Sequence, residues 1–115
     1  MKIGVTQIIL GGMSLNDTLS LCQDAGYDAV ELTFGEGQDT DINMSDTELG
    51  CIASKCEDAG IEISSITAGY ADRGNLLSLD ATQREKGAVS LARGLEVAGA
   101  LGVGGILLHP GQLTV

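Results

Sequence analysis

Residues 25–32 read AGYDAVEL, and in this stretch a helix-ending glycine, Gly26, comes three residues before an apolar strand. The same kind of joint recurs at residues 59–63, which read AGIEI, and at residues 101–106, which read LGVGGI. Each joint connects a helix to a strand through few residues, whereas the segments that lead from a strand to the next helix are long and polar. Strand–helix–strand alternation of this kind predicts a parallel sheet with right-handed crossovers.

Working outward from these joints, the sequence predicts four strands and three helices. The strands are expected at residues 2–6, 29–33, 62–67 and 105–109. Helix starts are indicated by the caps Ser14, Ser45 and Asp80, and the segment that begins at Ser45 is a capping box, SDTE. The third helix is expected to turn one apolar stripe toward the core, namely Ala88, Leu91, Ala92, Leu95, Ala98 and Gly99.

Two architectures are compatible with this alternation. A doubly wound sheet would carry a glycine-rich phosphate loop after the first strand, but residues 7–13 lack the G-x-G-x-x-G spacing. In the second strand, alternation turns Val30 and Leu32 to one face and Glu31 to the other, and in the fourth it turns His109 away from Ile106 and Leu108. Ionisable groups directed into one interior favour the N-terminal half of a (β/α)8 TIM barrel, an α/β fold, with parallel strands in the order 1-2-3-4.

The length and charge of the chain limit its organisation and its partners. We expect residues 1–115 to form one partial barrel domain that is cut after the fourth strand, because a whole barrel takes about 250 residues. The net charge of −10 and three aromatic residues argue against nucleic acid as a partner. No apolar run is long enough to span a bilayer, and no signal segment precedes the first strand, so we expect a soluble, cytoplasmic protein without a membrane partner.

Four stretches together resemble a known family, the xylose-isomerase-like sugar phosphate isomerases and epimerases, which share a barrel with the family-2 apurinic endonucleases. The resemblance extends over essentially the whole chain. It is carried by residues 26–32 (GYDAVEL), 75–80 (NLLSLD), 84–85 (RE), and 101–111 (LGVGGILLHPG).

The resemblance implies a metal-dependent isomerase or epimerase that transfers a proton beside a ketose carbonyl. The divalent metal of the complete barrel, Mn, Mg, Co or Zn, would take its ligands from later strands, so no metal site and no cofactor is expected in this chain, which alone is expected to be inactive. The partner would be a small sugar or sugar phosphate. The alternatives are an apurinic/apyrimidinic endonuclease on the same barrel, or a half-barrel fragment with no enzymatic role.

Glu31 and His109 are the candidate substrate-binding residues, and no catalytic residue is assigned. The resemblance implies that Glu31, at the end of the second strand, contacts the sugar. In the endonuclease branch, a histidine at the position of His109 is a zinc ligand. That branch also has a histidine after the third strand, where this chain reads TAGY at residues 67–70. Because both outer strands would be exposed edges, a homo-oligomer joined through them is also expected.

Overall fold

The structure of the chain is a computed structural model, and it describes residues 1–35, 37–68 and 75–113. Its four strands are β1 (Gly4–Thr6), β2 (Ala29–Thr33), β3 (Glu62–Ala68) and β4 (Ile106–Leu108). They form one parallel sheet in the order β1-β2-β3-β4, as the sequence predicts. The two outer strands are each shorter than expected, with three residues in place of five.

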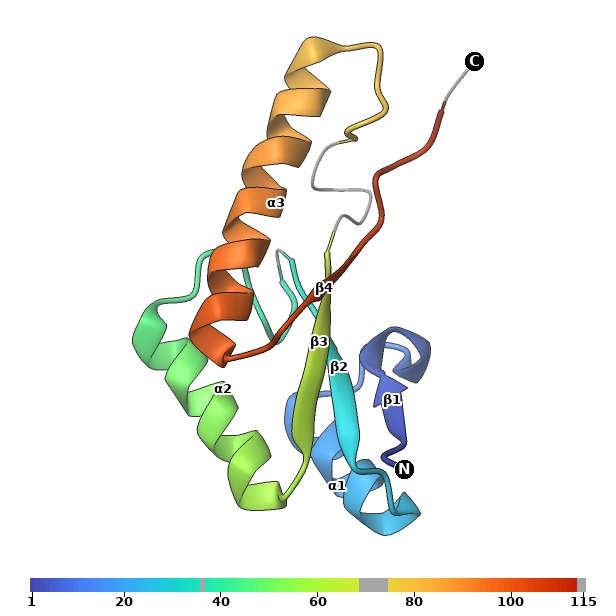
Figure 1. Cartoon of the computed structure of the whole chain (residues 1–115), viewed down its shortest axis with the longest axis vertical. Helices are drawn as coiled ribbons and strands as arrows, with labels where there is room; N and C mark the ends of the chain where they lie inside the picture. Colours follow the sequence, from blue (N-terminus) through green and yellow to red (C-terminus); the bar gives the residue numbers. More distant parts are fainter. Residues whose placement is uncertain (36, 69–74, 114–115) are drawn as a thin grey trace.

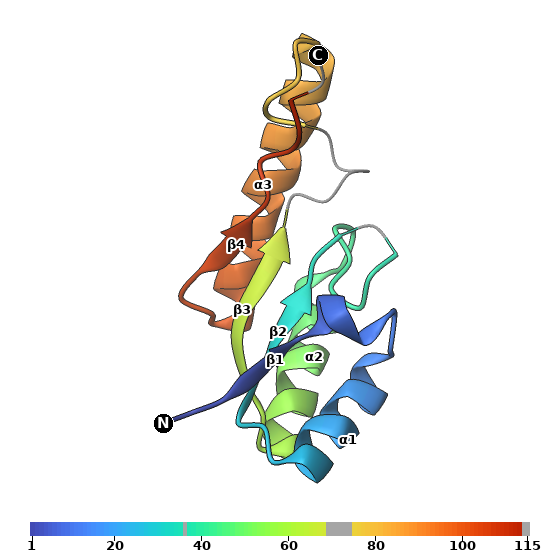
Figure 2. The same ribbon diagram turned by 90° about the vertical axis from the view of Figure 1, so that its right-hand side faces the viewer.

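Three helices, α1 (Leu15–Ala25), α2 (Asp46–Ala59) and α3 (Ala81–Leu101), lie on one face of this sheet (Figures 1 and 2). A short 3-10 helix, η1 (Gln7–Leu10), follows β1. The predicted caps are present, because the side chains of Ser14, Ser45 and Asp80 each accept a backbone N–H of the first turn. No helix of the described residues is both long and apolar enough to cross a membrane.

The hydrophobic core lies between the sheet and the helices. Val30, Leu32 and Phe34 point into it from β2 and the residue that follows it, and all three are fully buried. Cys22 of α1 and Cys56 of α2 are buried in the same core, where a free cysteine packs as a small hydrophobic side chain. The opposite face of the sheet carries no helix among the described residues, and Figure 2 shows the strands in front on that side.

A β-bulge in β3 sets which of its side chains reach this open face. Val30 pairs with Ile63, but the next residue, Glu31, pairs with Ser65, so that Ser64 is the extra residue. After the bulge, Ser65 and Thr67 share the face of Glu31, while Ile66 and Ala68 turn toward the helices. We call the face opposite the helices the inner face.

The stripe predicted to face the core on α3 is wrong in most of its members. The residues of α3 that the structure buries are Gly87, Ser90, Gly94, Val97, Ala98 and Leu101. Leu95 is 56 % exposed, and a Cβ on Gly99 would meet nothing within 4 Å. A Cβ on Gly94 would lie 3.5 Å from the Ala68 side chain and from the Phe34 ring, so the helix packs on the sheet through small residues.

Candidate functional site

The inner face carries a row of polar side chains, Thr6, Glu31 and Ser65, which lie side by side on β1, β2 and β3. The Thr6 hydroxyl donates to Oε1 of Glu31 at 2.9 Å, and the Ser65 hydroxyl donates to Oε2 at 2.7 Å. Each carboxylate oxygen therefore has one protein donor from a neighbouring strand. We call these three residues the inner row.

The surroundings of Glu31 favour its ionised form. Partial burial acts to raise the pKa of its carboxyl group, but hydrogen bonds from Ser65, Thr67 and Thr6 together outweigh burial and hold the pKa below its ordinary value of 4.5. The Thr67 hydroxyl is close enough to contribute to this effect, yet its oxygen is buried and makes no regular hydrogen bond within the described residues. Glu31 is therefore an anionic acceptor at neutral pH.

The position of Glu31 differs from the expected one in its depth. It is the third of five residues in β2 and not the last, because Leu32 and Thr33 continue the pairing with β3. Thr33, one inward-facing layer above it, is the residue at the rim. Glu31 thus lies below the carboxyl-end rim of the sheet.

His109 follows β4 directly, and its backbone N–H donates to the Ala68 carbonyl at 2.9 Å. Thr67 pairs with Leu107, and extending this register by alternation one residue beyond the end of β4 predicts that His109 shares the inner face with Glu31. The register separates the two by two strands across the sheet and four residues along it, on the order of 15 Å. The two residues thus lie at different heights of the sheet, and both their shared face and their substrate-binding role stay predictions.

Two loops at the carboxyl end of the sheet are joined by Gln7, a buried polar residue that the sequence did not single out. Its Oε1 accepts the Thr33 N–H at 3.1 Å, and its Nε2 donates to Oδ2 of Asp39 at 2.8 Å and to the Met13 carbonyl at 3.4 Å. Asp41, two residues beyond Asp39, accepts the N–H groups of Gly37 and Asn43, and these bonds hold its pKa below the ordinary value. Its carboxylate therefore shapes the loop locally.

The described residues contain no group of three or more His, Cys, Asp or Glu side chains that could hold a metal ion. The side chains hydrogen-bonded to Glu31 are the hydroxyl groups of Thr6 and Ser65. They do not supply the imidazole and carboxylate ligands that are typical of a catalytic zinc site. The described residues therefore supply no ligand set for a divalent metal, whose ligands the sequence resemblance assigns to later strands of the complete barrel. Of residues 67–70, the stretch in which the endonuclease branch has its additional histidine, Gly69 and Tyr70 lie outside the described residues.

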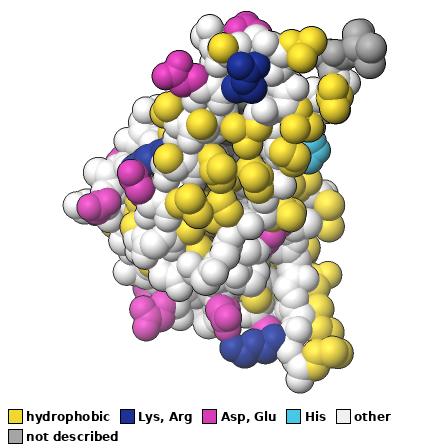
Figure 3. Space-filling view, turned by 45° about the horizontal axis from the view of Figure 1, so that its top comes forward, with side chains coloured by type: hydrophobic (Ala, Val, Ile, Leu, Met, Phe, Trp, Pro, Cys, Tyr) yellow, Lys and Arg dark blue, Asp and Glu magenta, His cyan; other side chains and the backbone are white. Residues whose placement is uncertain are grey.

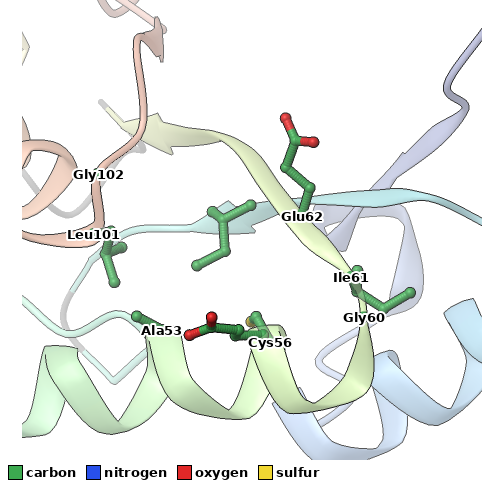
Figure 4. A pocket seen from close by; sticks show the side chains of 9 residues that line it. Ala53, Cys56, Gly60, Ile61, Glu62, Leu101 and Gly102 are labelled. Atoms are coloured by element: carbon green, nitrogen blue, oxygen red, sulfur yellow. The ribbon is translucent and has the colours of Figure 1, made fainter.

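A cavity of about 450 Å³ lies at the other end of the sheet, between α2, the start of β3 and the end of α3 (Figure 4). Ala53 and Cys56 face it from α2, and the Glu62 side chain points away from that helix. Burial raises the pKa of the Cys56 thiol, and the neighbouring Cys22 raises it further. A protonated, buried thiol is a poor nucleophile. The Cys56 thiol therefore gives this cavity no reactive group.

The sequence pattern of the xylose isomerase-like TIM barrel family matches residues 19–114. The chain belongs to this family. No curated protein sequence matches it significantly. Its four parallel strands in sequential order and its three outer helices are a part of the TIM barrel of that family.

Solved structures of xylose isomerase-like proteins superpose on the chain at low sequence identity. They include a putative xylose isomerase from Rhodospirillum rubrum (21 % identity, TM-score 0.76, 100 % of this chain and 41 % of that one). A D-tagatose 3-epimerase-like protein is 22 % identical, with TM-score 0.76 over 99 % of this chain and 39 % of that one. A D-psicose 3-epimerase crystallised in the presence of D-fructose is 24 % identical, with TM-score 0.74 over 96 % of this chain and 37 % of that one. The xylose isomerase-like chain thus spans about two fifths of each.

Proposed function

We propose that the complete barrel containing this segment is a sugar or sugar phosphate isomerase or epimerase that moves a proton beside a ketose carbonyl. In this proposal residues 1–115 are one partial barrel domain, and Glu31 and His109 contact the sugar from its inner face. The observation that carries the proposal is the Glu31 carboxylate on the inner face of a xylose isomerase-like barrel segment, where hydrogen bonds from Thr6 and Ser65 hold it ionised. A carboxylate in that position is suited to accept hydrogen bonds from the hydroxyl groups of a sugar.

A divalent metal, Mn, Mg, Co or Zn, remains part of the proposal for the complete barrel only. It would polarise the sugar oxygens when bound. Because the described residues supply no ligand set, the segment's own contribution is to bind and orient the sugar, and the 115-residue chain alone is proposed to be inactive.

Charge favours a sugar over the nucleic acid substrate of the endonuclease alternative. The chain carries 16 acidic and 6 basic residues, a net charge of −10. Such a field repels a phosphate backbone, whose binding depends on Lys and Arg contacts. No specific contact in the described residues favours the endonuclease.

We also propose that the isolated chain associates with a second copy through its edge strands. Leu107 and Leu108 of β4 are 55 % and 36 % exposed, and Ile3, beside β1, is 52 % exposed. Pairing of β4 with β1 of a second copy, and the reverse, would join two four-stranded sheets into a closed ring of eight parallel strands. Closure of this kind removes both exposed edges.

Solvent deuterium exchange tests the proposed activity. A neutral ketose and its phosphate are incubated in D2O with a divalent metal and either the complete barrel or the 115-residue chain, and proton NMR follows the positions beside the carbonyl. We expect exchange with the complete barrel and none with the chain alone. A complete barrel that exchanges no ketose but cleaves an apurinic site in DNA would contradict the proposal and favour the endonuclease.

A further inference from the structure

The inner row can accept hydrogen bonds from a ligand but has no hydroxyl proton left to donate to one. A hydroxyl group has one proton to donate, and an ionised carboxylate has none. The protons of Thr6 and Ser65 are both directed at Glu31, at 2.9 and 2.7 Å. What the three side chains can still offer a ligand is the lone pairs of two hydroxyl oxygens and of one carboxylate.

We propose that the inner row is an acceptor-only site that recognises the hydroxyl groups of a neutral polyol and does not hold a phosphate group. The inference rests on the proposed function, since it assigns to this row the uncharged hydroxyl end of the sugar. A polyol brings the protons that the row lacks, and adjacent hydroxyls can donate to both oxygens of one carboxylate. A phosphate brings negative charge and acceptor oxygens, which this row cannot pair with. Where the substrate carries a phosphate, that group is bound elsewhere.

Ser65 and Thr6 act in this proposal as positioning residues. They fix the two carboxylate oxygens from opposite sides, so Glu31 enters the site in a single orientation. The bulge at Ser64 is what brings Ser65 to this face, and bulges are known to re-aim side chains near functional sites. The neighbouring Ser64 hydroxyl has a different partner, the Val30 carbonyl at 3.2 Å, and its side chain does not belong to the row.

This pair of serines supplies a matched control for a binding experiment. The ¹⁵N-labelled 115-residue chain is titrated with D-sorbitol, with D-fructose and with inorganic phosphate, and the amide shifts of Thr6, Glu31 and Ser65 are followed by NMR. We expect both polyols to shift these amides and phosphate to leave them in place. Ser65→Ala and Glu31→Gln should each weaken D-fructose binding about tenfold, and Ser64→Ala should leave it within about twofold of the wild type.

Each contrary result overturns the proposal. Shifts of the row by phosphate, no shift of it by either polyol, or equal binding by Ser65→Ala and Ser64→Ala would each do so, provided that unaffected amides show the variants to be folded. D-sorbitol separates this inference from the proposed function, because it has no carbonyl. If D-sorbitol binds the row but the complete barrel exchanges no ketose proton, the row stands and the isomerase fails. If exchange occurs and Glu31→Gln leaves sugar binding unchanged, the isomerase stands and the row fails.

Discussion

Two arginines of α3 donate hydrogen bonds to backbone carbonyls. The carbonyls bound by Arg84 are close to it in the sequence, and those bound by Arg93 are distant. Arg84 donates to residues 78–79, just before its own helix, at 2.8 and 2.9 Å. Arg93 reaches the loop before α2, where it donates to the Ile42 carbonyl at 3.0 Å and to the Met44 carbonyl at 2.6 Å. The Arg93 contacts are half-buried and tie α3 to the loop that ends at the start of α2.

We therefore expect Arg93→Met to destabilise the fold more than Arg84→Met does. Loss of Arg93 removes charged donors from two half-buried carbonyls, which costs about 2 kcal/mol of the free energy of unfolding, while Arg84→Met at an exposed, local site costs about 0.5 kcal/mol. Urea unfolding of the two variants measures the difference. Equal losses would show that the link between α3 and the loop does not contribute.

The pH dependence of stability should report the hydrogen bonds to Glu31. Because its pKa in the folded state lies below the ordinary 4.5, the ionised group stabilises the fold above that value. This contribution is lost as pH falls through the lowered folded-state pKa. Ser65→Ala should bring the pKa of Glu31 closer to 4.5 and lower the free energy of unfolding by on the order of 1 kcal/mol at neutral pH, with little loss in strong acid.

Carbon-13 NMR titration of the Glu31 carboxyl group, together with unfolding at neutral and acid pH, checks this prediction. Ser64→Ala serves as the control, since its hydroxyl donates to a backbone carbonyl and not to Glu31. Overlaid titration curves for Ser65→Ala and the wild type would rule out the assigned cause of the shift.

At the residue scale, alternation in the second strand was enough to predict the face of Glu31, because Val30 and Leu32 must both be buried. Its partners were harder to find. In an unbulged strand, Ser65 would have pointed to the helices, and nothing in the run of residues 62–68 marks Ser64 as the extra residue. The role of Gln7 is not visible in the sequence for a similar reason, because its partners Thr33 and Asp39 lie 26 and 32 residues further along the chain and no local pattern indicates them.

At the scale of elements, α3 explains both a success and a failure of sequence reasoning. Its start and end follow from Asp80 and Gly102, which the structure confirms as caps. Its buried face does not follow from hydrophobicity, because two leucines of the expected stripe are not in the core: Leu91 is half-buried and Leu95 is 56 % exposed. The helix lies so close to Phe34 and Ala68 that only its side with small residues, including Gly94, fits against the sheet. The distance between helix and sheet cannot be read from the sequence.

The glycines of α3 should therefore respond differently to substitution. Gly99→Ala should raise the free energy of unfolding by about 1 kcal/mol, because a Cβ there meets nothing within 4 Å and alanine favours the helix. Gly94→Val should lower it by about 1–3 kcal/mol, because the added methyls would overlap the buried Phe34 ring. Thermal unfolding of both variants gives the comparison. A destabilising Gly99→Ala would mean that this side of α3 is covered.

At the scale of the whole molecule, the exposed apolar side chains favour the association of two copies, whereas the net negative charge opposes it. Leu107 is 55 % exposed on β4, and Val89 and Leu95 are 63 % and 56 % exposed on α3. Figure 3 shows hydrophobic side chains gathered on one face of the chain, with acidic side chains around them. A net charge of −10 on each copy opposes the association that these apolar groups favour.

We accordingly expect the purified chain to form dimers whose dissociation constant falls as salt is added, because salt screens the repulsion between two acidic copies. Light scattering at micromolar protein over a range of salt concentrations measures this. Leu107→Lys should shift the equilibrium to monomer, whereas Lys86→Ala, on the exposed side of α3, should not. A monomer at every salt concentration would contradict closure through the edge strands.

The central claim is that the inner face around Glu31, and not the cavity at the opposite end of the sheet, binds the sugar. Isotope-filtered NOE spectroscopy with ¹³C-labelled D-fructose and the unlabelled chain tests it most directly. We predict NOEs from the sugar to the side-chain protons of Thr6, Thr33 and Ser65. NOEs to Ala53, Cys56 and Ile61, which line the cavity at the opposite end of the sheet, without any to the inner face would contradict the account.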